Sequence, residues 1–126
     1  MKKLFLFFVL VSGSAYADWS RVGNFDNGDF YIDRATMTSK GGKREVWSLM
    51  DYRYAQMDSN KNIFRSTRTM LQLNCPEKKA RITHMSFFSG QMLRGNEISK
   101  MGMLKDWEPV APDTPIRRIL ETVCAL

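Results

Sequence analysis

The fold class is decided by the stretch Pro115–Cys124, which reads PIRRILETVC. Its apolar residues recur at intervals of three and four, which places them on one face of an α-helix. This face is formed by Ile116, Ile119, Leu120, Val123 and Cys124. Asp113 or Thr114 can cap the helix, and Pro115 suits its first position, where no amide donor is needed. The sequence therefore predicts an amphipathic C-terminal helix with a cysteine on its buried face.

The chain before this helix carries the patterns of β-structure. Two short predicted strands, residues 20–25 and 29–33, flank Asp26-Asn27-Gly28. An Asn-Gly pair between apolar-containing runs is a strong hairpin signal, because both residues tolerate positive φ angles. A second turn is predicted at Lys40-Gly41-Gly42-Lys43. The first half of the chain therefore predicts neighbouring antiparallel strands.

Three longer strands are predicted next, over residues 44–54, 63–74 and 79–89. The polar cluster at residues 58–62 separates the first two, and Pro76 ends the second because it lacks the amide donor that continues a ladder. In the third strand, alternation places four residues on one side: Ile82, His84, Ser86 and Phe88.

The region between the last long strand and the helix has weaker patterns. Residues 89–102 contain three glycines and predict a turn, a short strand and a loop, whereas residues 107–115 contain three prolines and predict an irregular extended segment. The complete pattern predicts an α+β fold, in which an antiparallel β-sheet of about five or six strands packs with the C-terminal α-helix.

Residues 1–17 have the features of a cleavable signal peptide. Lys2 and Lys3 are followed by an apolar run over residues 4–11 and by Ala15-Tyr16-Ala17, whose small residues suit a signal peptidase. The apolar run is too short to cross a bilayer, which needs about 20 residues. Position 18 holds aspartate where a lipoprotein would carry its lipidated cysteine. We therefore expect cleavage before Asp18, a single domain over residues 18–126, and an exported protein, periplasmic or secreted, without a membrane anchor.

The two cysteines, Cys75 and Cys124, are predicted to form a disulfide, because export places them where disulfides persist. Cys75 shares a strand face with Leu71 and Leu73, so the bridge would join the sheet to the apolar face of the helix. Closing a loop of about 50 residues stabilises the fold by roughly 4 kcal/mol in the chain-entropy model. The alternative is a redox or nucleophilic thiol, but neither cysteine has a Cys-x-x-Cys partner or a neighbouring histidine in the sequence.

Positive charge is the one physical hint at a partner. Removing residues 1–17 takes away two lysines and no acid, which leaves 17 basic and 13 acidic residues and a net charge of +4. Lys40, Lys43 and Arg44 flank a glycine turn that should project from the fold, and we predict that these three bind acidic proteins or polyanions. The alternative is a solvated surface that only keeps the protein soluble. No RNA-binding motif occurs, and nucleic acid is a poor partner for an exported domain.

The sequence predicts no catalytic, cofactor or metal site. His84 is the single histidine, and no nucleophile elbow, phosphate loop or zinc spacing occurs. Asp33, Glu45 and Asp51 lie in predicted strands, but sequence does not place any two of them at the separation that glycoside hydrolysis requires. We therefore expect the protein not to be an enzyme.

The order of several short motifs resembles that of the surface-adhesin protein E family, a family of small exported proteobacterial domains. The motifs are Trp19, Tyr31-Ile32-Asp33 with Thr36, Val46-Trp47-Ser48-Leu49 with Asp51-Tyr52, Ser66 before Cys75, Trp107 with Pro112, and the terminal Val123-Cys124. The resemblance implies an antiparallel sheet packed with a C-terminal helix, and attachment to host extracellular-matrix or plasma proteins. Adhesive members are lipid-anchored, whereas this chain has Asp18 at the cleavage point.

Two functions follow from these observations. The first is a non-enzymatic exported binding module of a Gram-negative bacterium, adhesin-like in its partners. The second is a small periplasmic enzyme, inhibitor or envelope-maintenance protein with an unrecognised site. The sequence carries no signal for an oligomeric state.

Overall fold

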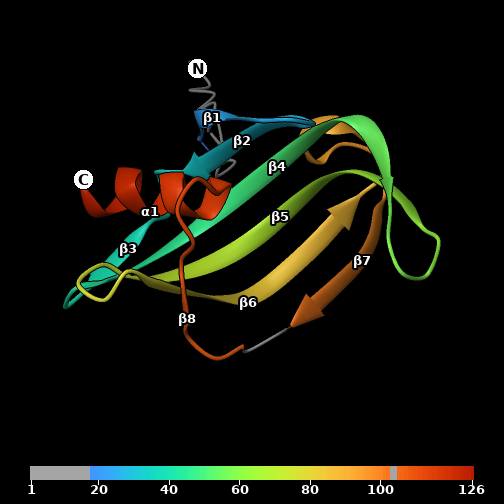
Figure 1. Cartoon of the computed structure of the whole chain (residues 1–126). Coiled ribbons are helices and arrows are strands. Elements are labelled where there is room, and N and C mark those ends of the chain that lie inside the picture. Colours follow the sequence, from blue (N-terminus) through green and yellow to red (C-terminus); the bar gives the residue numbers. More distant parts are fainter. Residues whose placement is uncertain (1–17, 103–104) are drawn as a thin grey trace, which may run out of the picture.

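A computed structural model describes residues 18–102 and 105–126 of the chain, and the predicted signal peptide lies outside the described residues. One antiparallel sheet dominates the described part, and a C-terminal helix lies across one of its faces (Figure 1). The elements are β1 (Trp19–Phe25), β2 (Gly28–Asp33), β3 (Thr38–Lys40), β4 (Lys43–Met57), β5 (Ile63–Asn74), β6 (Lys79–Phe88), the 3₁₀ turn η1 (Gln91–Leu93), β7 (Glu97–Gly102), β8 (Glu108–Pro109) and α1 (Pro115–Cys124).

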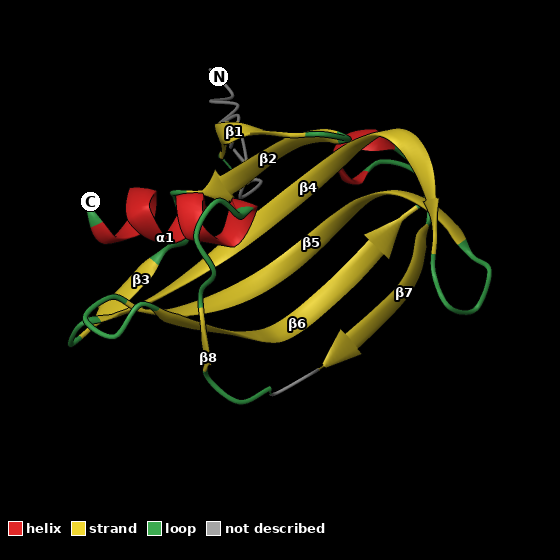
Figure 2. Ribbon diagram, in the orientation of Figure 1, coloured by secondary structure: helices red, strands yellow, loops and turns green. Residues whose placement is uncertain are grey.

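The predicted α+β fold class is confirmed. Six strands form the main sheet in the order β1-β2-β4-β5-β6-β7, while β3 pairs with β4 and β8 with β6. Figure 2 shows α1 over one end of this sheet, near the turn between β3 and β4. Strand β4 extends three residues beyond the predicted 44–54, and the predicted irregular segment 107–115 contains the short strand β8. None of the helices within the described ranges is long and apolar enough to cross a membrane.

The predicted β1–β2 hairpin is present, but Gly28 has a different role from the one its sequence pattern suggests. Phe25 pairs with Gly28, so Asp26 and Asn27 form the turn and Gly28 already belongs to β2. A Cβ atom at Gly28 would lie 1.9 Å from the backbone oxygen of Asp51 on β4. Gly28 is therefore required for close approach of two backbones, and not for a positive φ angle.

The main core lies between α1 and the sheet. Side chains of the helix, Ile119, Leu120 and Val123, pack against buried residues of the four central strands. The sheet contributes Phe30, Ile32, Val46, Leu71, Leu73 and Ala80. Thr114 caps the helix by accepting a hydrogen bond from the Arg117 backbone amide, and Pro115 occupies its first turn. Of the two predicted caps, the structure therefore selects Thr114.

The predicted alternation of β6 is wrong beyond Ile82. Leu71 pairs with Ile82, but the preceding residue Met70 pairs with His84, so Thr83 is an extra residue in the ladder. This bulge exchanges the two faces of the strand. Ile82 faces the core under α1, whereas His84 faces the opposite side of the sheet, which α1 leaves uncovered.

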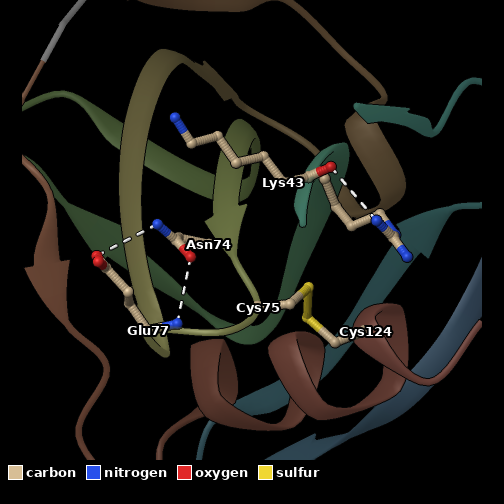
Figure 3. Close-up of a disulfide and its surroundings, with 6 residues drawn as sticks. Lys43, Asn74, Cys75, Glu77 and Cys124 are labelled. Carbon is tan, nitrogen blue, oxygen red and sulfur yellow. Dashed lines mark hydrogen bonds between the residues drawn. A yellow bond between two sulfur atoms is a disulfide. The ribbon is translucent and has the colours of Figure 1, made fainter. Parts of the chain in front are cut away.

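The predicted disulfide between Cys75 and Cys124 is confirmed. It joins the residue that follows β5 to the last residue of α1, with the two Cα atoms 5.8 Å apart (Figure 3). The corner at Cys75 is held by its own backbone amide, which donates to the Gly42 carbonyl, and by two hydrogen bonds between Asn74 and Glu77. The bridge therefore attaches the helix to the same corner of the sheet that carries the Gly41-Gly42 turn.

Candidate binding groove

The three predicted binding residues surround the turn between β3 and β4. Lys40, the last residue of β3, pairs directly with Lys43, the first residue of β4, and Gly41 between them has a φ angle of 54°. Lys40 and Lys43 are exposed and Arg44 is half-buried. Like charges at directly opposed strand positions repel each other. This end of the sheet therefore concentrates positive charge at a projecting turn.

All three residues line one groove of about 260 Å³. The other lining residues come from elements distant in sequence: Thr38 on β3, Glu45 on β4, Gln72 on β5, Arg81 on β6, and Trp107 just before β8. We call this the basic groove. Its floor is the face of the sheet opposite to α1. The side chains of β4, β5 and β6 that point toward α1 belong to the core, so Glu45, Gln72 and Arg81, which alternate with them along these strands, point the other way.

Trp107 holds two of the cations in place. The guanidinium carbon of Arg81 lies 4.5 Å from the centroid of the indole ring, and the ammonium nitrogen of Lys43 lies 5.6 Å from it. Both distances are within the range of a cation–π interaction. The indole ring therefore brings the side chains of Lys43 from β4 and Arg81 from β6 close to each other.

A chain of side-chain hydrogen bonds crosses the sheet beneath the groove. Arg81 Nε donates to Gln72 Oε1 at 2.6 Å, and Gln72 Nε2 donates to Glu45 Oε2 at 2.9 Å. Glu45 thus accepts from a neutral amide. Since Nε is engaged, the terminal guanidinium nitrogens of Arg81 are the ones left to meet a ligand.

Among the described residues, the cations of the groove have no acidic partners. Within the described ranges, the ion pairs are Arg21–Asp29, Lys79–Glu77 and Arg117–Glu121, and none involves a groove residue. Four cations line the groove, Lys40, Lys43, Arg44 and Arg81, against the single carboxylate of Glu45. An anionic group entering the groove would meet four cations that form no ion pair among the residues that the structure describes, two of which, Lys43 and Arg81, stack on Trp107.

Arg81 and Trp107 were not predicted as site residues. Arg81 belongs to a second basic cluster in the sequence, after the Cys75 corner, and Trp107 is a single aromatic residue in a proline-rich segment. Trp107 could have been predicted as a site residue from one signal. A large aromatic side chain in an irregular segment needs a surface to pack on.

A second cation–aromatic stack lies on the same face of the sheet. The Arg68 guanidinium carbon is 4.3 Å from the Trp47 ring centroid, and the His84 ring is 6.2 Å from Trp47. His84 is exposed and its Nδ1 lies 3.0 Å from the Thr83 hydroxyl. His84 is therefore placed on a surface beside the Arg68 cation and the Trp47 ring, and among the described residues its ring contacts the Thr83 hydroxyl and no carboxylate.

The three strand carboxylates are separated and each has a hydrogen-bonding role of its own. Asp33 accepts from the Ala35 amide and the Thr36 hydroxyl, and Asp51 accepts from the Met92 amide in η1. Glu45 accepts from Gln72. Over residues 18–102 and 105–126, no group of three His, Cys, Asp or Glu side chains is arranged to hold a metal ion.

Comparisons with known proteins agree with this architecture. The family model of surface-adhesin protein E matches residues 19–125. No curated protein sequence matches the chain.

Two solved structures of Haemophilus influenzae protein E are similar in fold. One has a TM-score of 0.63 at 17% sequence identity and covers 83% of each chain. Protein E from non-typeable Haemophilus influenzae has a TM-score of 0.63 at 18% identity, covering 85% of this chain and 75% of that chain. At such identities the likeness concerns the fold alone.

Proposed function

Because this chain belongs to the surface-adhesin protein E family, we propose that it is an exported, non-enzymatic binding module that holds an acidic partner in the basic groove. The observation that carries the proposal is the set of four groove cations that form no ion pair in the described part of the chain, two of them stacked on Trp107. The adhesin description of the family supports a macromolecular partner. The partner class is an acidic stretch of a host extracellular-matrix or plasma protein, or another polyanion.

The geometry supports binding for two physical reasons. Side chains held before a ligand arrives lose less conformational entropy on binding, and Trp107 supplies that restraint for Lys43 and Arg81. Hydrogen bonds from cations to carboxylate or sulfate are also stronger than neutral ones. Exposed charge of one sign raises the encounter rate with an acidic partner, and salt screens this attraction over about 8 Å at physiological ionic strength.

Export without a lipid is part of the same proposal. Cleavage after Ala17 would leave Asp18 as the first residue of the domain, one residue before β1. The protein would then act in the periplasm or outside the cell.

The test replaces Lys40, Lys43 and Arg44 together by Ser. The probes are immobilised heparin, which presents sulfates, and a polyglutamate peptide, which presents carboxylates. We expect binding to at least one probe to weaken by about ten-fold or more, which corresponds to about 1.4 kcal/mol. We also expect the salt dependence of binding to become shallower.

The matched control removes three exposed cations outside the groove: Arg34→Ser, Arg94→Ser and Lys100→Ser. This variant has the same net charge as the groove variant, so non-specific attraction is equal in the two. If both variants and the parent bound the probes with equal affinity across a salt titration, the proposal that the basic groove binds the partner would be refuted. Turnover of an envelope substrate that is lost on changing His84 or Asp51 would refute a non-enzymatic role.

A further inference from the structure

A second surface stands out at the opposite end of the sheet, where β4 turns into β5. The side chains of Tyr54, Met57 and Ile63 are 71%, 63% and 53% exposed. Among the described residues, five large apolar side chains are exposed, and these three belong to one hairpin end. Met57 pairs directly with Ile63 across the ladder. We call residues 53–65 the hairpin end.

The exposure of Tyr54 results from an irregularity in the pairing of β4 with β5. Asp51 pairs with Ser66, and the next pair joins Gln56 to Phe64, so four residues of β4 lie opposite one residue of β5. Extra residues of this kind bend a strand and turn side chains outward. The exposed tyrosine is therefore a consequence of the backbone path.

Three successive carbonyl groups in this irregularity each accept a side-chain hydrogen bond. Gln91 Nε2 donates to the Tyr52 oxygen at 3.0 Å. Arg65 donates to the Arg53 oxygen at 2.7 Å, and Gln56 Nε2 donates to the Tyr54 oxygen at 2.9 Å. The conformation that presents Tyr54 is thus held from both strands of the hairpin and from η1.

The turn that closes the hairpin is also fixed. Asp58 Oδ1 accepts from the backbone amides of Asn60 and Asn62, and Asp58 Oδ2 accepts from the Asn62 side chain. Its carboxylate is therefore directed into the turn. Lys61 occupies the turn with a φ angle of 62° and is exposed.

The hairpin end combines apolar side chains with positive charge. Arg53, Lys61 and Arg65 are its three cations, and Asp58 is its one acid, which gives a net charge of +2. In Figure 1 the connection between β4 and β5 projects beyond the sheet, at the end away from α1 and the β3–β4 turn. The hairpin end is therefore a rigid, projecting, cationic and partly apolar tip.

We propose that the hairpin end docks the protein on an anionic phospholipid surface. Tyrosine is favoured at the membrane interface, where its ring is apolar and its hydroxyl stays hydrated. Met57 and Ile63 would enter the acyl boundary, while Arg53 and Lys61 contact phosphate groups.

The test measures co-sedimentation of the exported protein with vesicles. The anionic vesicles contain phosphatidylglycerol and phosphatidylethanolamine, and the neutral vesicles contain phosphatidylcholine. We expect binding to the anionic vesicles alone, and a loss of at least ten-fold in the variant Tyr54→Ser, Met57→Ser, Ile63→Ser. An unchanged Tm and far-ultraviolet circular dichroism establish that this variant is folded.

Three controls separate this proposal from others. Met101→Ser removes one exposed apolar side chain from β7 and should leave vesicle binding unchanged. Arg53→Gln with Lys61→Gln should weaken binding to anionic vesicles and keep the apolar contacts. The groove variant should still bind vesicles, whereas the hairpin variant should still bind heparin.

Several results would overturn the proposal. One is that the parent protein does not sediment with anionic vesicles, and another is that the hairpin variant sediments as well as the parent. A third is that light scattering shows a dimer of the parent that the hairpin variant loses, which would make the tip a contact between copies of the chain. A hairpin variant that keeps vesicle binding while the groove variant loses it would locate the lipid contact in the basic groove.

Discussion

Replacing Cys75 and Cys124 by Ser should lower the stability of this protein substantially. The two cysteines are separated by 49 residues, and the chain-entropy model gives about 4 kcal/mol for a closed loop of that length. A domain of about 100 residues loses roughly 4 °C of Tm for each kcal/mol. The expected shift in Tm is therefore on the order of 15 °C.

The position of the bridge in the structure indicates where the loss should appear first. Helix α1 has ten residues, and an isolated helix of that length is marginal in water. Its attachment depends on the bridge at Cys124 and on the packing of Ile119, Leu120 and Val123 against the sheet. Without the bridge, α1 should separate from the sheet at a lower cost than the strands separate from one another.

Thermal unfolding of the parent and the double serine variant measures the first effect, and amide hydrogen exchange measures the second. Reduction of the parent should reproduce the variant, because both remove the same covalent link. A shift in Tm below about 3 °C would refute the reasoning, since the bridge would then constrain neither the unfolded chain nor the helix. Equal loss of protection in α1 and in β5 would refute the local part of the argument.

Three further predictions follow from other features. N-terminal sequencing of the exported protein should begin at Asp18 without an acyl group, and an acylated or blocked residue would contradict the export proposal. Gly28→Ala should reduce the free energy of unfolding by about 1 to 3 kcal/mol in urea denaturation, because its Cβ would lie 1.9 Å from the Asp51 backbone oxygen; a neutral result would contradict that contact. Burial raises the pKa of the Tyr52 phenol above its ordinary value of 10.0. The folded state then holds this proton more tightly than the unfolded state, so the stability it contributes is present below about pH 10 and is lost as the pH rises through the raised value; Tyr52→Phe should reduce that loss in a denaturation series above pH 9.

Local sequence patterns were sufficient to predict a helix or strand where the pattern lies within one contiguous segment. The 3.6-residue period of residues 115–124 predicted α1, and alternation with turn residues predicted the long strands, because helix and strand faces are properties of contiguous residues. The disulfide was predicted from the export signal, the count of two cysteines, and their positions at a strand end and on the apolar face of the helix. These features account for the fold class and for the attachment of the helix to the sheet.

Two features of the sheet depend on the pairing between strands and could not be predicted from the local sequence pattern. Thr83 reads as an ordinary strand residue, and its bulge exists only because Leu71 and Met70 pair with Ile82 and His84. Gly28 reads as a turn residue, and its close approach to Asp51 exists only once β2 lies beside β4. In both cases the cause is a neighbouring strand that is distant in sequence.

The two candidate surfaces were likewise predictable from the sequence only in part, and tertiary structure determined the rest. The cluster of Lys40, Lys43 and Arg44 is visible in the sequence because its members are adjacent across one turn. Arg81 and Trp107 join them only in the folded chain, since β6 and the segment before β8 reach this corner through the sheet. The sequence by itself determined the elements, the bridge and the sign of the charge. Tertiary structure alone decided which cations share a groove and which apolar side chains stay exposed, because both depend on contacts between residues far apart in the chain.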